Sequence, residues 1–139
     1  RRQRQMCIRE RDAVSVYTII GTDHALEKIA VFLRTSPLCR GCPANEIMKG
    51  LRIIMRNNVF KFGDTFWIQE DGTAMGTPLA PDYATLYFSI HELAILPTFP
   101  DSIVAYFRYI DDCLALWLHH PNPDVDIQNW NAFQTAMNA

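Results

Sequence analysis

Apolar residues recur along this chain at two different spacings, and these spacings predict a mixture of helices and short strands. Spacings of three and four residues are typical of helices that bury one face, whereas short β-branched and aromatic runs bounded by turn residues are typical of strands. The predicted order is strand 13–20, helix 22–35, helix 44–57, hairpin strands 59–62 and 65–69, helix 81–96, hairpin strands 104–107 and 113–118, and helix 126–138. Such an order predicts an α+β domain whose helices cover one face of an antiparallel sheet and leave the other face free for a ligand.

Composition supports one globular unit with an apolar core. The chain has 139 residues, of which 49% are hydrophobic and 20% are charged. No apolar run reaches the roughly 20 residues that span a bilayer, and the amino terminus lacks a signal-peptide pattern, so we expect an intracellular protein without membrane contact. The chain starts at Arg1 and stops inside a helical pattern at Ala139, so we expect a fragment of a longer protein.

Positive charge is concentrated at the amino terminus. The formal net charge is −2, but five arginines lie within residues 1–11. We interpret this segment as a basic arm, or a truncated edge, ahead of a domain formed by residues 12–139. The arm has two possible roles, contact with nucleic acid or simple solvation, and its composition favours neither.

Cysteines are too few and too unevenly spaced for a disulfide framework. Cys39 and Cys42 form a C-x-x-C, which is half of a zinc site or a redox pair in some proteins. No second pair of ligands follows at zinc-finger spacing. A loop between two helices is therefore the favoured interpretation, and the role of the pair stays open.

The segment Tyr109-Ile110-Asp111-Asp112 sets two adjacent carboxylates between apolar runs, at the expected tip of a hairpin. Like charges there repel each other, and a bound divalent cation would offset that repulsion. Asp12 is expected on a neighbouring strand, so three carboxylates would suit phosphoryl transfer assisted by two metal ions. The alternatives are a solvated turn for Asp111-Asp112 and an ordinary surface residue for Asp12.

Three motifs in this order resemble those of reverse transcriptases, most closely those of Penelope-like retroelements. Residues 12–18 resemble the first palm motif, an Asp followed five residues later by an aromatic residue. Residues 72–81 resemble the signature G-T-A-M-G-[ST]-x-x-A-P, and residues 107–112 contain the Y-x-D-D box. The resemblance covers nearly the whole chain from Asp12 onward.

The resemblance implies a partial polymerase palm without complete fingers and thumb, from a retrotransposon enzyme that is an RNA-directed DNA polymerase, a nucleotidyltransferase. Its partners would be an RNA template, a DNA primer and deoxynucleoside triphosphates, and its cofactor two Mg²⁺ ions, with Mn²⁺ as a substitute. The implied location is nuclear if the retroelement is eukaryotic. The implied site residues are Asp12, Asp111 and Asp112 as catalytic metal ligands, Tyr17 beneath the incoming sugar, and Met75 and Gly76 lining the nucleotide pocket.

Two features depart from the common pattern of the family. Arg9-Glu10-Arg11 precede Asp12, where the family has an apolar strand, and Met75 replaces a Gln that many reverse transcriptases carry, as it does in Penelope-type sequences. The alternative function is therefore an inactive remnant that at most binds nucleic acid. In either case we expect residues 1–139 alone to extend no primer, because fingers and thumb are missing.

Overall fold

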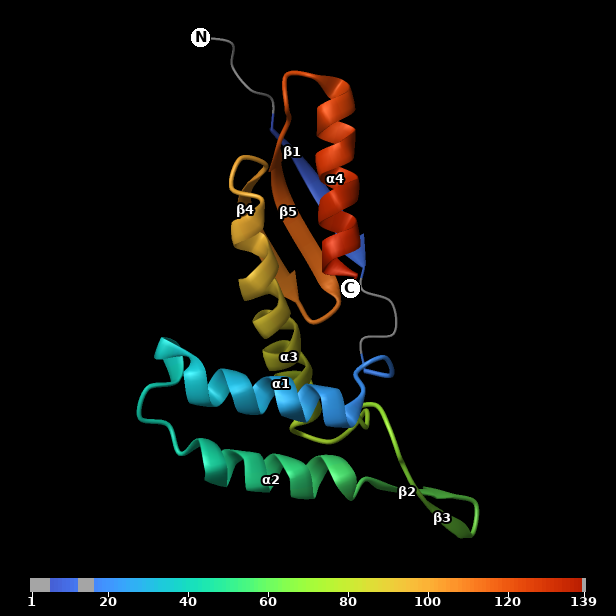
Figure 1. Ribbon diagram of the computed structural model, residues 1–139. Helices are drawn as coiled ribbons and strands as arrows, with labels where there is room; N and C mark the ends of the chain where they lie inside the picture. Colours follow the sequence, from blue (N-terminus) through green and yellow to red (C-terminus); the bar gives the residue numbers. More distant parts are fainter. Residues whose placement is uncertain (1–5, 13–16, 139) are drawn as a thin grey trace. The chain divides into compact units, whose positions relative to one another are not determined.

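The computed structural model describes residues 6–12 and 17–138, which form four α-helices and five strands in two compact units (Figure 1). Unit 1 is built from residues 1–14 and 91–139, and unit 2 from residues 15–90. The predicted α+β class is confirmed. In chain order the elements are β1 (Met6–Asp12), α1 (Thr22–Thr35), a 3₁₀ turn (Pro37–Cys39), α2 (Ala44–Arg56), β2 (Val59–Phe62), β3 (Thr65–Ile68), α3 (Ala80–Ile95), a second 3₁₀ turn (Leu96–Thr98), β4 (Ile103–Tyr109), β5 (Asp112–Leu118) and α4 (Pro123–Met137).

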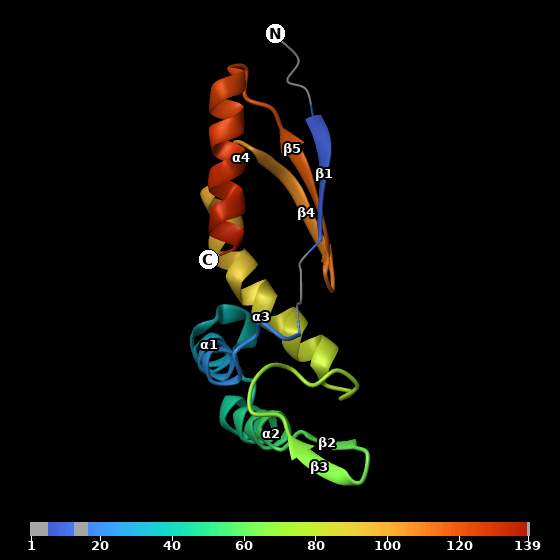
Figure 2. The ribbon, with the colours of Figure 1, turned by 90° about the vertical axis from the view of Figure 1, so that its right-hand side faces the viewer.

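Unit 1 contains an antiparallel sheet with the strand order β1-β5-β4. α4 and the last turns of α3 lie on one face of this sheet, as Figure 2 shows edge-on. The predicted arrangement, with helices on one face only, is confirmed for this unit. The opposite face leaves large apolar side chains exposed, among them Met6, Ile8, Phe107 and Tyr109.

The core of unit 1 is aromatic. Trp117 of β5 is fully buried, and its ring packs edge-on against Trp130 of α4 at a centroid distance of 5.1 Å. Phe133, one helical turn further along α4, is also buried and lies 5.9 Å from Trp117. Large aromatic side chains supply much buried area per residue, so these three contribute strongly to the packing of α4 on the sheet.

A buried carboxylate joins this core to β1. The side chain of Asp126 on α4 accepts hydrogen bonds from Trp117 Nε1 at 3.1 Å, His119 Nδ1 at 2.8 Å and the His120 amide at 2.9 Å. Arg9 Nη2 lies 3.6 Å from the same carboxylate. Burial by itself raises the pKa of Asp126, but the hydrogen bonds from His120, His119 and Trp117 outweigh it and lower the pKa to about 2.

The strand predicted at residues 13–20 is wrong where it can be checked. Residues 17–20 form turns and bends, residues 13–16 lie outside the described residues, and the strand of this region is β1, which ends at Asp12. All seven residues of β1 pair with β5, so a complete ladder of backbone hydrogen bonds favours the strand despite its charged side chains.

Within residues 1–11, interpreted from the sequence as a basic arm or a truncated edge, residues 6–11 belong to β1. Arg9 is not a solvated arm residue, since its guanidinium lies over the Trp130 ring at 4.2 Å from the centroid. Residues 1–5, with Arg1, Arg2 and Arg4, lie outside the described residues.

Unit 2 packs α1 against α2, as the helical spacing predicted. Its buried residues include Leu26 and Ile29 of α1, Met48 and Met55 of α2, and Tyr83 of α3.

In the part of the chain that the structure describes, no helix has the length and apolar character to cross a membrane.

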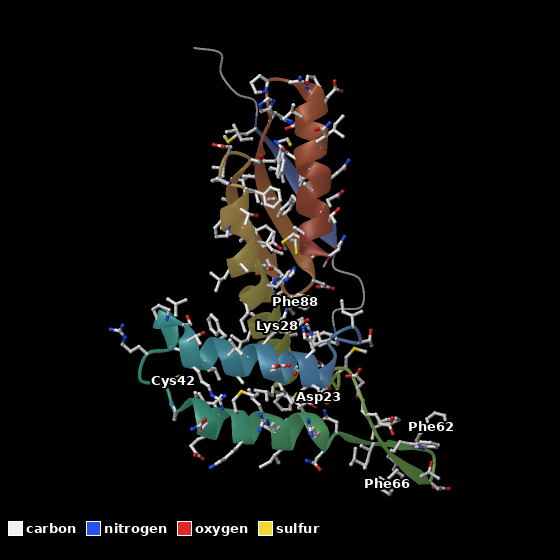
Figure 3. All side chains as sticks on the ribbon, viewed as in Figure 1. Asp23, Lys28, Cys42, Phe62, Phe66 and Phe88 are labelled. Atoms are coloured by element: carbon white, nitrogen blue, oxygen red, sulfur yellow. The ribbon has the colours of Figure 1, made fainter. Side chains whose placement is uncertain are left out.

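The β2–β3 hairpin has the predicted strands but leaves every residue of both strands exposed. Phe62 and Phe66 project from it (Figure 3) and are 76% and 72% exposed. Trp67 of the same hairpin is 56% exposed. A two-stranded ribbon buries side chains only where another layer covers it.

The first turn of α1 receives a cap from a residue distant in the sequence. Gly21 precedes the helix and offers no side-chain acceptor, and Asp71 Oδ1 instead accepts from the Thr22 amide at 2.7 Å and from the Gly72 amide at 2.9 Å. These hydrogen bonds lower the pKa of Asp71, and the hydrogen bond from Thr22 has the larger effect. The carboxylate thus satisfies an otherwise unpaired helical donor and complements the helix dipole.

We expect Asp71→Ala to lower the melting temperature of the protein by a few degrees at neutral pH, because it removes this cap. Since the folded pKa lies below the unfolded one, the stabilisation is present above the ordinary pKa of an Asp and disappears as pH falls through the folded value. Thermal melts of wild type and Asp71→Ala should therefore converge in acid. Glu70→Ala removes the neighbouring exposed carboxylate as a control, and an equal loss for Glu70→Ala would contradict the cap.

Candidate active site

The β4–β5 hairpin carries both adjacent carboxylates at its tip, where the sequence placed them. Tyr109 pairs with Asp112, so Ile110 and Asp111 form a two-residue turn. Asp111 and Asp112 are both exposed. Ile110 has φ 55°, a left-handed conformation that is strongly unfavourable for a β-branched residue. The turn therefore stores strain at the position next to the first Asp.

Asp12 meets the hairpin through the register of the sheet. It is the last residue of β1 and pairs directly with Asp112. Directly opposite residues of an antiparallel pair have Cα atoms about 4.5–5.5 Å apart, so the two aspartates occupy one rung at the end of the sheet. The structure thus brings together the backbones of Asp12, Asp111 and Asp112, although the side chain of Asp12 lies outside the part it describes.

This cluster has the chemistry of a divalent-cation site. Like charges directly opposite each other on neighbouring strands are unfavourable, and carboxylate oxygens are the ligands that Mg²⁺ prefers. Among the side chains that the structure describes, no three of His, Cys, Asp and Glu form a ready-made metal-binding group. Asp111 and Asp112 supply two carboxylates, and the third predicted ligand is Asp12. Three carboxylates are the kind of ligand that Mg²⁺ prefers.

Several polar side chains lie beneath the turn, and the sequence patterns had not predicted a role for them. Arg108, Tyr106 and Cys113 lie on the covered face of the sheet, and Glu92 of α3 contacts Arg108 and Tyr106. The alternation of side chains along β4 could have indicated them, because it places Tyr106 and Arg108 on the face opposite to Phe107 and Tyr109.

The predicted nucleotide-binding residues Tyr17, Met75 and Gly76 all belong to unit 2. The Thr73 amide donates to the Tyr17 carbonyl at 2.7 Å, which joins Tyr17 to the loop that carries Met75 and Gly76. Gly72 starts this loop at φ +81°, a left-handed conformation that favours glycine. Met75 is 74% exposed, and Gly76 has φ +98°.

Cys39 and Cys42 lie in the connection between α1 and α2, where Figure 3 labels Cys42. Burial, and then the neighbouring Cys42, raise the pKa of the Cys39 thiol. A raised pKa disfavours the thiolate, which is the form that binds metal or reacts. The position of the pair between two helices agrees with the favoured interpretation from the sequence.

A scan against protein-family models gives no match for this chain, and a search of curated proteins finds no similar sequence.

Proposed function

We propose that this chain is the palm portion of a retroelement reverse transcriptase of the Penelope-like kind, which synthesises DNA on an RNA template. The observation that carries the proposal is the sheet register that sets Asp12 opposite Asp112, beside Asp111 in the hairpin turn. The order of the three motifs in the sequence supports it independently.

In this proposal Asp12 and Asp111 hold two Mg²⁺ ions, or Mn²⁺ in their place, and Asp112 completes the acidic cluster. When bound, the ions polarise the primer 3′-hydroxyl and stabilise charge on the transferring phosphate and the pyrophosphate leaving group. The rest of the chain would contribute to catalysis by positioning the primer, the nucleotide and the metal ligands, because phosphoryl transfer depends mainly on positioning and electrostatics.

The resemblance assigns selection of the nucleotide to Tyr17, Met75 and Gly76. Tyr17 would lie beneath the incoming sugar and exclude a ribose 2′-hydroxyl, while Met75 and Gly76 would contact the templating pair. The hydrogen bond from Thr73 to Tyr17 supports a shared role for these residues, because it fixes the loop on the Tyr17 backbone. The substrates are then deoxynucleoside triphosphates, a DNA primer and an RNA template. In a eukaryotic retroelement this work would take place in the nucleus.

The test is primer extension by the complete reading frame that contains residues 1–139, on an RNA template with a labelled DNA primer. We expect extension whose products follow the template sequence, which stops when EDTA removes divalent cations and returns when Mg²⁺ or Mn²⁺ is added. Incorporation of a chain-terminating dideoxynucleotide only opposite its complement is the control for templating.

One result would contradict the polymerase proposal. A folded protein that extends no primer with either metal, yet retards labelled RNA–DNA duplex in a gel, would support the inactive remnant instead. Residues 1–139 expressed alone are expected to extend no primer.

A further inference from the structure

A buried ion pair lies under the candidate catalytic turn. Arg108 of β4 and Glu92 of α3 form two parallel contacts, Nε to Oε1 at 2.5 Å and Nη2 to Oε2 at 3.2 Å. Their side chains are only 6% and 11% exposed. A bidentate pair of this kind fixes the orientation of the guanidinium as well as its position.

Tyr106 completes the environment of the carboxylate. Its hydroxyl donates to Glu92 Oε1 at 3.1 Å. Burial is the main cause that raises the pKa of Tyr106, so the hydroxyl keeps its proton and stays a donor. Glu92 therefore has a set of donors that leaves it little freedom to rotate, and Arg108 is held against it.

The network reaches the turn through two carbonyl groups. Arg108 Nη1 donates a long hydrogen bond to the Ile110 carbonyl at 3.4 Å, and Cys113 Sγ donates to the Asp111 carbonyl at 3.7 Å. Both carbonyl oxygens of the two-residue turn are thus held from the covered face of the sheet. Strained backbone such as that of Ile110 persists only where surrounding contacts determine it.

Stability alone is a poor explanation for this ion pair. The desolvation of two buried charges consumes most of their attraction, and an apolar pair of similar volume often stabilises a protein at least as well. Geometry is the better explanation, because ligands of a metal ion need placement to within about 0.5 Å by residues that are themselves held rigidly.

We propose that Arg108, oriented by Glu92, is a positioning residue that fixes the hairpin turn in the conformation in which Asp111 and Asp112 bind metal. The proposal rests on the proposed function. Arg108 touches no substrate in this scheme and acts through the backbone carbonyl of Ile110.

The experiment compares wild type, Arg108→Lys and Glu92→Gln in the complete reading frame. Lysine keeps the positive charge beside Glu92 but has one compact donor group, which cannot bridge Glu92 and the Ile110 carbonyl together. We expect kcat for extension to fall about 10- to 100-fold, as for residues that orient metal ligands. KM for the nucleotide should stay within about twofold, and the Mn²⁺ concentration for half-maximal rate should rise. Exposed Arg34→Lys and Glu46→Gln are the matched controls.

Hydrogen exchange separates positioning from folding. The peptide covering residues 107–114 should exchange faster in Arg108→Lys and Glu92→Gln, while circular dichroism shows the variants to be folded. Unchanged kcat and Mn²⁺ dependence would overturn the proposal, and so would an activity loss equal to the loss of folded protein. If wild type and Asp111→Asn are equally inactive, the proposed function fails. Hydrogen exchange of residues 107–114 then decides alone whether Arg108 fixes the turn. Faster exchange in the variants supports this positioning role, and equal exchange overturns it.

Discussion

Asp111→Asn is expected to reduce primer extension by the complete reading frame at least about a thousandfold, which corresponds to about 4 kcal/mol of transition-state stabilisation. Asparagine keeps the size of the side chain but removes the charge that a divalent cation needs, and metal ions contribute several kcal/mol to such reactions. Asp112→Asn should cost less, because in the proposed scheme Asp112 touches metal less directly. Single-nucleotide extension under saturating Mg²⁺ measures both losses.

A control in the same unit distinguishes a site effect from a general charge effect. Asp101 lies in the turn before β4 and is exposed, so Asp101→Asn should keep full activity. Asp111→Asn should also melt no lower than wild type without metal, because it removes repulsion between adjacent carboxylates. Retention of more than a tenth of the activity by Asp111→Asn would contradict its role as a metal ligand.

Asp126→Ala is expected to destabilise unit 1 by about 3 kcal/mol, since it leaves buried donors of Trp117 and the His120 amide unpaired and removes the partner of Arg9. Asp126→Asn should cost less, because its amide oxygen still accepts one of these bonds. Urea denaturation followed by the fluorescence of Trp117 and Trp130 measures the loss.

Asp124→Ala is the matched control for this prediction. Asp124 lies in the same first turn of α4 but is exposed, so its loss should cost only the helix-dipole term of about 0.3–1 kcal/mol. Equal destabilisation by Asp124→Ala and Asp126→Ala would mean that charge at the helix start matters and the buried network does not.

Acid should weaken the Asp126 network in a defined range. The folded pKa of about 2 lies below the usual value near 4, so the stabilisation is complete above pH 4 and is lost as pH falls towards 2. The difference in unfolding free energy between wild type and Asp126→Asn should therefore shrink over that interval. A difference that stays constant down to pH 2 would contradict the assigned pKa.

Local patterns predicted most of the elements. The helices predicted at residues 22–35 and 44–57 and the hairpin strands predicted at 59–62 and 65–69 match α1, α2 and the β2–β3 hairpin closely. These features depend on neighbours within a few residues, and such neighbours are visible in a sequence.

Elements that depend on distant partners were harder to predict. The charged residues Arg9 and Glu10 argued against a strand, yet β1 forms because β5 offers a complete ladder of hydrogen bonds. The β2–β3 hairpin is rich in apolar residues such as Trp67, but whether another layer covers a hairpin is decided by the fold. Asp71 and Asp126 had no local signal at all, because the donors that they satisfy depend on how the chain folds back on itself.

For the candidate site, the chemistry could be predicted from local sequence: two adjacent carboxylates in a short turn, a glycine loop and an earlier Asp, in an order that resembles that of a polymerase palm. The geometry of the site depends on the tertiary structure. The register of β1 on β5 set Asp12 at the rung of Asp112, and the Glu92–Arg108 pair brought α3 under the turn. Both are pairings between residues far apart in the chain, and such pairings are fixed by packing and backbone hydrogen bonding across the whole sheet.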